Sequence, residues 1–149
     1  MGEVEAMNEV YLLNMMQIGH YQRQIDACLD DDVDLWKRQF KDKMELWDKV
    51  YSGFIQMWAV CDGDCIHAVF MTEITSKPDA VLRIFWAYGT RLLEVIPEVD
   101  DIVNAFAREM GCVEIEITGR KGWEKVFRAS GAKHVFSVFR RPVRHVKGH

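Results

Sequence analysis

The most informative segment of the chain is Gly119-Arg120-Lys121-Gly122-Trp123-Glu124-Lys125-Val126-Phe127-Arg128-Ala129-Ser130-Gly131-Ala132. It lies in the last third of the chain, residues 97–142, where the spacing of apolar residues switches between helical and strand periods. Pro97 suits the first turn of a helix, and Gly111 suits the left-handed residue that ends one. A strand over 112–117, a short helix within the quoted stretch and a strand over 132–139 follow. This part therefore predicts the order helix, strand, helix, strand.

Three runs typical of β-strands precede this part of the chain. They cover residues 54–60, 65–74 and 81–88 and are rich in β-branched and aromatic residues. Asp62-Gly63, between the first two runs, is a dipeptide typical of a tight hairpin. We therefore expect an antiparallel meander of three strands. The third run is apolar almost throughout, which predicts burial on both of its faces.

The N-terminal part, residues 1–52, is predicted to be helical. Apolar residues recur at helical spacing from Asn8 to Leu29, and a second helix is expected between the N-capping Asp32 or Asp34 and Gly53. The predicted fold class is therefore α/β (α+β): two N-terminal helices, a three-stranded meander, then helix, strand, helix and strand around a single mixed sheet. The apolar face of the second helix carries Trp36, Phe40 and Trp47, which we interpret as core or subunit-contact residues.

Length and composition indicate one globular domain over residues 1–149, with 49% hydrophobic and 28% charged residues. The four cysteines are interpreted as reduced structural thiols and no metal site is expected, because their spacing does not repeat as pairs of ligands. No apolar run is long enough for a membrane span. The acidic N-terminus lacks the positive charge of a signal peptide. We expect a cytoplasmic protein.

Charge is distributed unevenly along the chain. Residues 1–34 carry eight acids and one base, whereas residues 120–149 carry nine bases and one acid. Such asymmetry can align identical subunits head to tail, or it can simply mark two solvated faces. The basic tail 140–149 has no interleaved aromatics and the chain as a whole is acidic, so nucleic-acid binding is not favoured. The residues expected to contact partner subunits are Trp36, Phe40, Trp47, Arg140, Arg141 and Arg144.

The order of elements, together with the turn from Gly119 to Trp123 and the Gly131-Ala132 pair, resembles the GNAT acyltransferases. The resemblance covers residues 50–142 and implies a fold in which acetyl-CoA binds after the third meander strand. There, a glycine-rich loop at the start of the next helix holds the pyrophosphate through backbone N–H groups. The positions implied for the cofactor are Gly89, Thr90 and Arg91.

The segment in the position of this loop is unusually acidic. It has one glycine, and it carries Glu94, Glu98, Asp100 and Asp101. At an effective dielectric of about 20, each carboxylate within about 4 Å of a phosphate charge costs on the order of 4 kcal/mol. The sequence therefore predicts that pyrophosphate does not bind there in the usual way.

The sequence gives only weak signals for catalytic residues. By the resemblance, the best match to a general base is Glu73, near the end of the second meander strand. The tyrosine that would protonate the leaving thiolate is missing from the helix around Trp123 and Phe127.

The chain also resembles short GNAT-like proteins of tailed phages and prophages. From this we predict a non-catalytic structural or assembly protein without a cofactor, such as a head-tail connector or adaptor in a phage virion. It would act through homo-oligomeric or ring contacts in the host cytoplasm and then in the virion. The alternative is an acetyl-CoA-dependent N-acetyltransferase with Glu73 as base and an atypical cofactor loop over 89–95. A regulator that binds a small acyl ligand is a third possibility.

Overall fold

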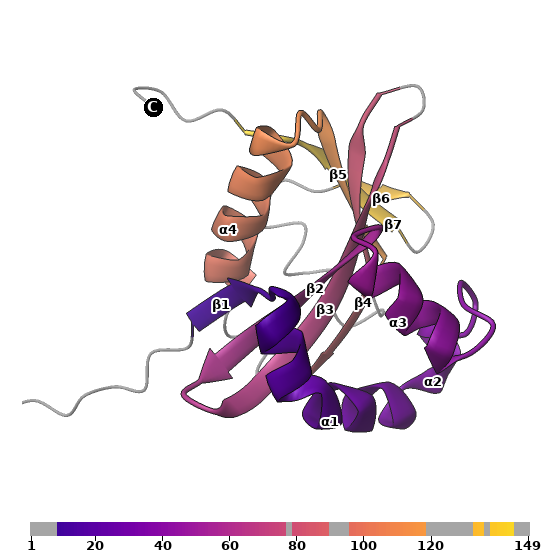
Figure 1. Ribbon diagram of the computed structural model, residues 1–149. Helices are drawn as coiled ribbons and strands as arrows, with labels where there is room; N and C mark the ends of the chain where they lie inside the picture. Colours follow the sequence, from indigo (N-terminus) through magenta and orange to yellow (C-terminus); the bar gives the residue numbers. More distant parts are fainter. Residues whose placement is uncertain (1–8, 77–78, 90–95, 119–132, 136–137, 145–149) are drawn as a thin grey trace, which may run out of the picture.

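The structure, a computed structural model, describes residues 9–76, 79–89, 96–118, 133–135 and 138–144. In chain order the elements are β1 (Glu9–Leu12), α1 (Met15–Asp31), α2 (Val33–Trp36), α3 (Lys43–Tyr51), β2 (Ile55–Asp62), β3 (Cys65–Thr75), β4 (Val81–Gly89), α4 (Ile96–Glu109), β5 (Glu114–Thr118), β6 (Lys133–Val135) and β7 (Val138–Pro142) (Figure 1). The short helix expected within residues 119–132 lies outside the described residues.

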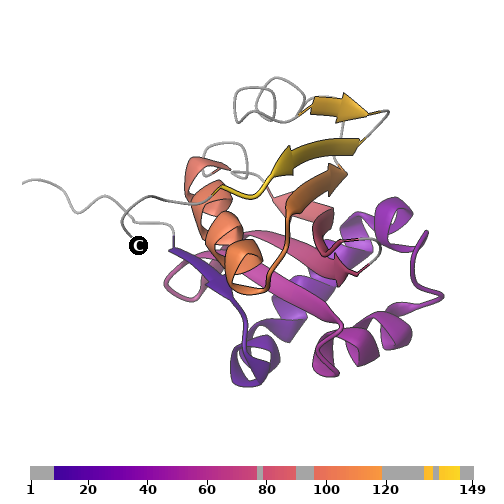
Figure 2. The same cartoon turned by 90° about the horizontal axis from the view of Figure 1, so that it is seen from above.

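All the described strands belong to one mixed sheet in the order β1-β2-β3-β4-β5-β7-β6, with β1 and β6 at its two edges (Figure 2). Only β4 and β5 pair in parallel among the described strands, and the other pairs are antiparallel. The meander of β2, β3 and β4 is confirmed. Gly63 has a φ of 59°, as the Asp62-Gly63 hairpin requires.

The N-terminal part differs from the prediction in two places. Residues 9–12, which were expected to begin the first helix, form β1 and pair with residues 58–61 of β2. Asn14 then starts α1 with a capping box, since its side chain accepts a hydrogen bond from the Gln17 N–H at 2.9 Å while the Gln17 side chain accepts from the Asn14 N–H. The predicted second helix is two helices, because Asp42 caps the start of α3 through the Glu45 N–H.

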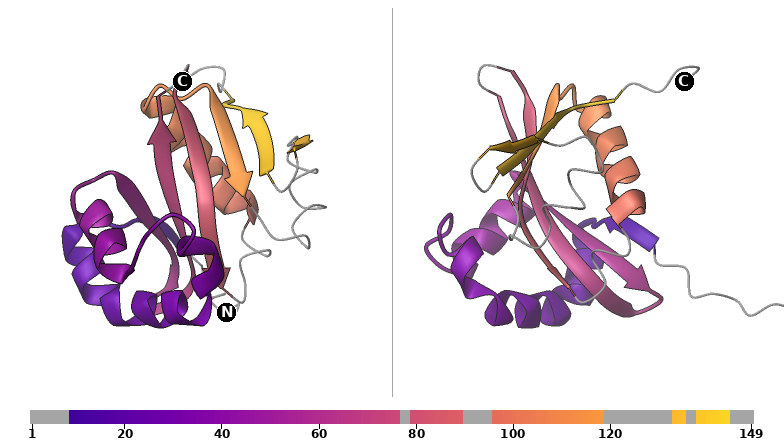
Figure 3. Two further views of the ribbon diagram at one scale, coloured as in Figure 1. Left: turned by 90° about the vertical axis from the view of Figure 1, so that its right-hand side faces the viewer. Right: turned by 180° about the vertical axis from the view of Figure 1, so that it is seen from behind.

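The sheet carries a hydrophobic core on each face. Helix α4 covers one face, and α1, α2 and α3 cover the other (Figure 3). Strand β4 contributes to both cores, with Leu82 and Ala87 under α4 and Phe85 and Trp86 under the N-terminal helices. This confirms the prediction that the third meander strand is buried on both faces.

Candidate functional site

Strands β4 and β5 run together for only part of their length. They pair from Val81 opposite Glu114 to Ile84 opposite Ile117. Beyond Ile84, β4 continues to Gly89 and pairs with β3 alone among the described residues. The outer backbone edge of β4 over residues 85–89 therefore has no strand partner in the described part of the chain.

A β-bulge lies at the point where the two strands separate. Thr72 of β3 pairs with Ile84, whereas its neighbour Met71 pairs with Trp86, so Phe85 is an extra residue on β4. A bulge bends its strand and increases the local twist. Because Phe85 follows directly on the last residue of β4 that pairs with β5, the bulge accounts for the separation.

A row of three charged residues crosses the sheet just before the bulge. Arg83 lies opposite Glu73 of β3 on one side and opposite Glu116 of β5 on the other. Its guanidinium donates from Nη1 to Glu73 and from Nε to Glu116 Oε1 at 3.2 Å. The side chains of Glu73, Arg83 and Glu116 are 24%, 28% and 14% exposed. The row is thus mostly shielded from water and holds one guanidinium between two carboxylates.

The charged row lies on the face of the sheet that α1, α2 and α3 cover. Cross-strand partners share a face, and Glu73 is the partner of Ile55, which belongs to the core under these helices. The sequence pointed to Glu73 alone. The signal for Arg83 was a charged residue inside an apolar strand, and the signal for Glu116 was its alternation with apolar residues. Only the strand register shows that these side chains contact Glu73 and one another in a row.

Of the residues predicted to hold a cofactor, the structure describes Gly89. It is the last residue of β4, with a φ of 153°, and it pairs with Ala68. A Cβ atom there would lie 2.4 Å from the His67 carbonyl oxygen and 2.5 Å from the Ala68 Cα. Close packing against β3 therefore requires glycine at this position. Thr90 and Arg91 lie outside the described residues.

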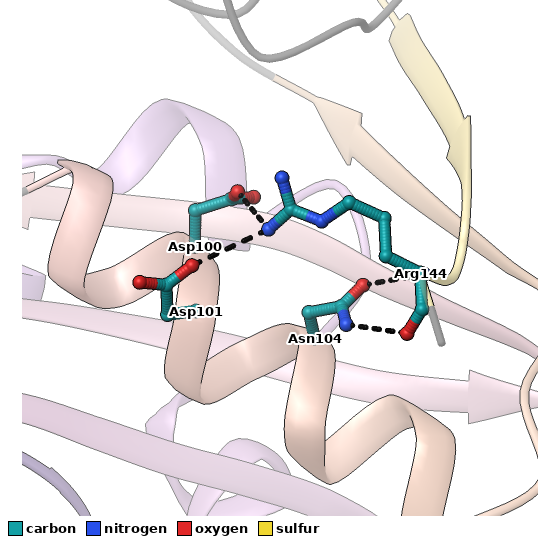
Figure 4. A network of polar contacts seen from close by, with 4 residues as sticks. All are labelled: Asp100, Asp101, Asn104 and Arg144. Carbon is teal, nitrogen blue, oxygen red and sulfur yellow. Dashed lines mark hydrogen bonds and ion pairs between the residues drawn. The ribbon is translucent and has the colours of Figure 1, made fainter. Parts of the chain in front are cut away.

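The acidic start of α4 is partly compensated from the C-terminal segment. Arg144 Nη2 donates to Asp100 Oδ2 at 2.7 Å and lies 3.4 Å from Asp101 Oδ1 (Figure 4). Asn104, which is 4% exposed, fixes the backbone of Arg144: its amide donates to the Arg144 carbonyl and its oxygen accepts from the Arg144 N–H, both at 2.9 Å. The sequence placed Arg144 at a subunit contact, whereas the structure pairs it with helix α4 of its own chain.

The other predicted partner residues have structural roles where they are described. Trp36, Phe40 and Trp47 are 2%, 6% and 8% exposed and lie inside the core under the N-terminal helices. The indole of Trp36 donates to the Leu29 carbonyl, and that of Trp47 donates to Asp26. These rings are therefore core residues and not surface anchors. Residues 140 and 141 lie in β7, and their side chains are outside the description.

A pocket of about 530 Å³ lies between the end of α1 and the end of β4. Its lining includes Cys28, Asp31 and Tyr88. The Tyr88 hydroxyl donates to Asp31, and this hydrogen bond raises the pKa of Tyr88 above its ordinary value. Burial, and then the charge of Asp31, raise the pKa of the Cys28 thiol. Both groups are therefore held in their protonated forms at neutral pH.

Within the described residues, no group of three or more His, Cys, Asp or Glu side chains is arranged to hold a metal ion. In the same part of the chain, no helix combines the length and apolarity needed to cross a membrane.

Comparison with solved structures places this architecture in a known class of fold. Over 93% of its length the chain superposes on all of a probable acetyltransferase from Staphylococcus epidermidis, with a TM-score of 0.68 and 11% identity. A GNAT-family acetyltransferase from Brucella melitensis in complex with acetyl-CoA matches 95% of the chain over 91% of its own length, with a TM-score of 0.64 and 9% identity. The chain has the GNAT fold.

A further solved structure supports the same assignment. A predicted acetyltransferase with acetyl-CoA from Clostridium acetobutylicum matches 87% of the chain over 92% of its own length, with a TM-score of 0.62 and 15% identity. No protein-family model and no curated protein matches the sequence.

These neighbours correct the function predicted from the sequence. The non-catalytic phage head-tail component is the wrong reading, because the solved structures that share this fold are acetyltransferases and give no support to a virion role. They favour the alternative. The sequence alone did not show that Arg144 is paired with Asp100 and Asp101 of α4.

Proposed function

We propose that the chain is an acetyl-CoA-dependent N-acetyltransferase that transfers acetyl groups to an amine. The observation that carries this proposal is the separation of β4 from β5 at the Phe85 bulge. The separation leaves the backbone edge of residues 85–89 without a strand partner in the described part of the chain. A ligand with amide groups can bind such an edge as an added strand does.

The open edge suits the chemistry of this cofactor. Acetyl-CoA supplies an acetyl thioester at the end of an extended arm that carries amide groups. Backbone N–H and C=O groups of β4 beyond Ile84 would bind that arm. The indole N–H of Trp86, in the same half of β4, is fully buried and has no hydrogen-bond partner among the described residues. An unpaired buried donor costs about 1–3 kcal/mol, so an acceptor from a ligand or a water would stabilise this half of the strand.

The charged row of Glu73, Arg83 and Glu116 suits the acceptor side. An amine is mostly protonated at neutral pH and must lose a proton before its nitrogen attacks the thioester carbonyl. Arg83 binds Oε1 of each carboxylate, so the row has a formal net charge of −1, which favours the approach of an ammonium group. We assign Oε2 of Glu73 as the atom that accepts the proton, directly or through a water.

The test is calorimetric titration of the protein with acetyl-CoA, followed by an assay of thiol release with a panel of amines. We expect micromolar binding and amine-dependent release of free thiol. Absence of binding at millimolar acetyl-CoA would overturn the proposal. Binding without thiol release for any amine would overturn its catalytic part and leave an acyl-ligand-binding role. The matched ligand control is free adenosine diphosphate, which lacks the arm that the β4 edge would bind.

A further inference from the structure

The start of α4 does not fit the diphosphate of acetyl-CoA. Residues 89–101, from the end of β4 to the first turns of α4, contain four acids and one base. Arg144 brings one further positive charge, and it is already bound to Asp100 and Asp101 (Figure 4). With Arg144 included, five of these charges cancel only in part and leave a formal charge of −2. The segment therefore has no surplus of positive charge to offer a diphosphate.

The acids also counteract the attraction that the start of a helix has for anions. The free backbone N–H groups and the helix dipole favour negative charge at this end. In α4, Glu98 lies in the first turn and is exposed, and Asp101 follows with 82% exposure. Carboxylates in these positions interact with the dipole themselves. They therefore offset its positive end and repel a second anion.

The features that suit an acyl donor lie on β4. The backbone edge of residues 85–89 has no strand partner in the described part of the chain, and it suits the amide groups of the pantetheine arm. The buried indole N–H of Trp86 adds a donor that has no partner among the described residues. Hydrogen bonds of this kind join neutral groups, so binding at this edge does not require the diphosphate.

From this contrast we infer that the protein recognises its donor through the acyl-pantetheine arm alone, and that the start of α4 opposes the diphosphate. The donor class is therefore an acyl-pantetheine thioester, and the nucleotide end of acetyl-CoA contributes nothing favourable to binding. The inference rests on the proposed function, because it uses the same β4 edge. It also accounts for the single glycine of residues 89–101, since a loop that binds phosphate closely needs several.

The expected size of the repulsion follows from Coulomb's law. One unit charge at roughly 10 Å from a doubly charged diphosphate in water changes the affinity by about threefold at low salt. Two such charges change it by about tenfold. The effect should fade above about 0.5 M salt, where the Debye length falls below roughly 5 Å. A site that attracts phosphate has the opposite salt dependence, because salt then weakens binding.

The experiment compares the dissociation constants of acetyl-CoA, acetyl-pantetheine and free adenosine diphosphate by calorimetry at low and high salt. Acetyl-pantetheine lacks the diphosphate and should bind the parent protein about tenfold more tightly than acetyl-CoA at low salt. The two affinities should agree within about twofold at high salt. Free adenosine diphosphate should not bind at millimolar concentration. Tighter binding of acetyl-CoA than of acetyl-pantetheine at low salt would overturn the inference.

A charge variant tests the repulsion at α4 directly. Glu98→Gln/Asp101→Asn removes two exposed carboxylates and leaves Asp100 as the partner of Arg144. This variant should tighten the binding of acetyl-CoA about tenfold at low salt and leave that of acetyl-pantetheine unchanged. The matched control is Glu109→Gln/Asp48→Asn, which neutralises two exposed acids at the other end of α4 and on α3 and should change neither affinity. An unchanged affinity of Glu98→Gln/Asp101→Asn for acetyl-CoA would overturn the inference.

The outcomes distinguish this inference from the proposed function. If neither thioester binds the parent protein, the proposed function falls and the inference falls with it. If acetyl-CoA binds more tightly than acetyl-pantetheine and salt weakens its binding, the proposed function stands and only the inference is overturned. Tighter binding of acetyl-pantetheine at low salt, with the difference lost at high salt, would support both.

Discussion

Asn104 and Arg144 are joined by a pair of hydrogen bonds, in which the buried amide side chain donates to the Arg144 carbonyl and accepts from the Arg144 N–H, each at 2.9 Å. The two residues are 40 positions apart. An amide that binds both polar groups of one residue acts like a strand partner for that residue. The pair therefore fixes where the chain runs after β7.

We predict that Asn104→Ala destabilises the protein by about 1–2 kcal/mol. The substitution removes both hydrogen bonds and leaves a small gap in a packed helix face. Urea unfolding at pH 7 measures the change. Asp101→Ala, on the exposed side of the same helix, should shift stability by less than about 0.5 kcal/mol. An equal loss in the two variants would contradict the role given to Asn104.

Gly89→Ala should destabilise the protein by about 2 kcal/mol or more. The added Cβ would overlap the His67 carbonyl oxygen and the Ala68 backbone, and neither atom can move without shifting β3. Gly19→Ala is the matched control, since no atom lies within 4 Å of its Cβ position in α1, and it should stabilise by roughly 0.5–1 kcal/mol. Thermal unfolding of the two variants in parallel tests the contrast; similar melting temperatures would refute it.

The cysteines should react in a fixed order. Cys65 is exposed, whereas burial raises the pKa of the Cys61 and Cys112 thiols, which lowers their thiolate fraction and shields the sulfur. With a chromogenic disulfide reagent at pH 7.5, we expect fast modification of Cys65 in the native protein and reaction of the two buried thiols only on unfolding. Cys65→Ser should abolish the fast phase, and a fast phase that persists would contradict this order.

The Tyr88 hydroxyl should make stability depend on alkaline pH. Its hydrogen bond to Asp31 raises the pKa of Tyr88 in the folded state. The associated stabilisation is therefore complete below the unfolded value of about 10, and it is lost as pH rises through the folded-state pKa. We expect the free energy of unfolding of the parent to be higher than that of Tyr88→Phe by about 0.5–1 kcal/mol at pH 8. This difference in stability should disappear by about pH 11.

Asp31→Asn is the control for this effect, because it weakens the hydrogen bond that is the main cause of the raised Tyr88 pKa and also removes the charge of Asp31, which is a smaller cause. Absorbance titration at 295 nm should show the Tyr88 pKa fall in this variant. A parent titration curve with all tyrosines at their ordinary pKa would refute the prediction.

Glu73→Gln should slow acetyl transfer by about 10²–10⁴-fold while leaving the affinity for acetyl-CoA unchanged. The glutamine keeps the size of the side chain and an oxygen for Arg83, but it accepts no proton. Glu116→Gln is the comparison, since it removes the other carboxylate of the same row. If kcat falls equally in both variants, the row acts through its total charge and Glu73 has no special role.

Local signals were enough to predict the part of the fold that depends on neighbours in the chain. The Asp62-Gly63 turn and the strand runs beside it gave the meander, and Pro97 and Gly111 bounded α4 closely. The pattern failed at Glu9–Leu12, because a short apolar run before Asn14 suits the first turn of a helix as well as an edge strand. Residues 9–12 form a strand because they pair with β2, and no signal within this short segment indicates that pairing.

The candidate site was harder to predict because the residues that form it are brought together by the register of strand pairing. Glu73, Arg83 and Glu116 come from three strands, and only the pairing brings them into one row. Likewise, Asp100 and Arg144 are 44 positions apart, so local sequence gave no sign of the ion pair between them.

The bulge on β4 also shows that the alternation of side chains between the two faces of a strand and the curvature of that strand can be set by different residues. Arg83 lies on the face of the N-terminal helices, Leu82 lies under α4, and Phe85 and Trp86 both return to the face of the N-terminal helices. Deletion of Phe85 would restore strict alternation without moving any other side chain of β4 to the opposite face. The assignment of the other β4 side chains to the two faces of the sheet therefore does not depend on Phe85, whereas the curvature of β4 does. Deletion of this single residue would straighten β4 against β5 and leave every other β4 side chain in the core to which it now belongs.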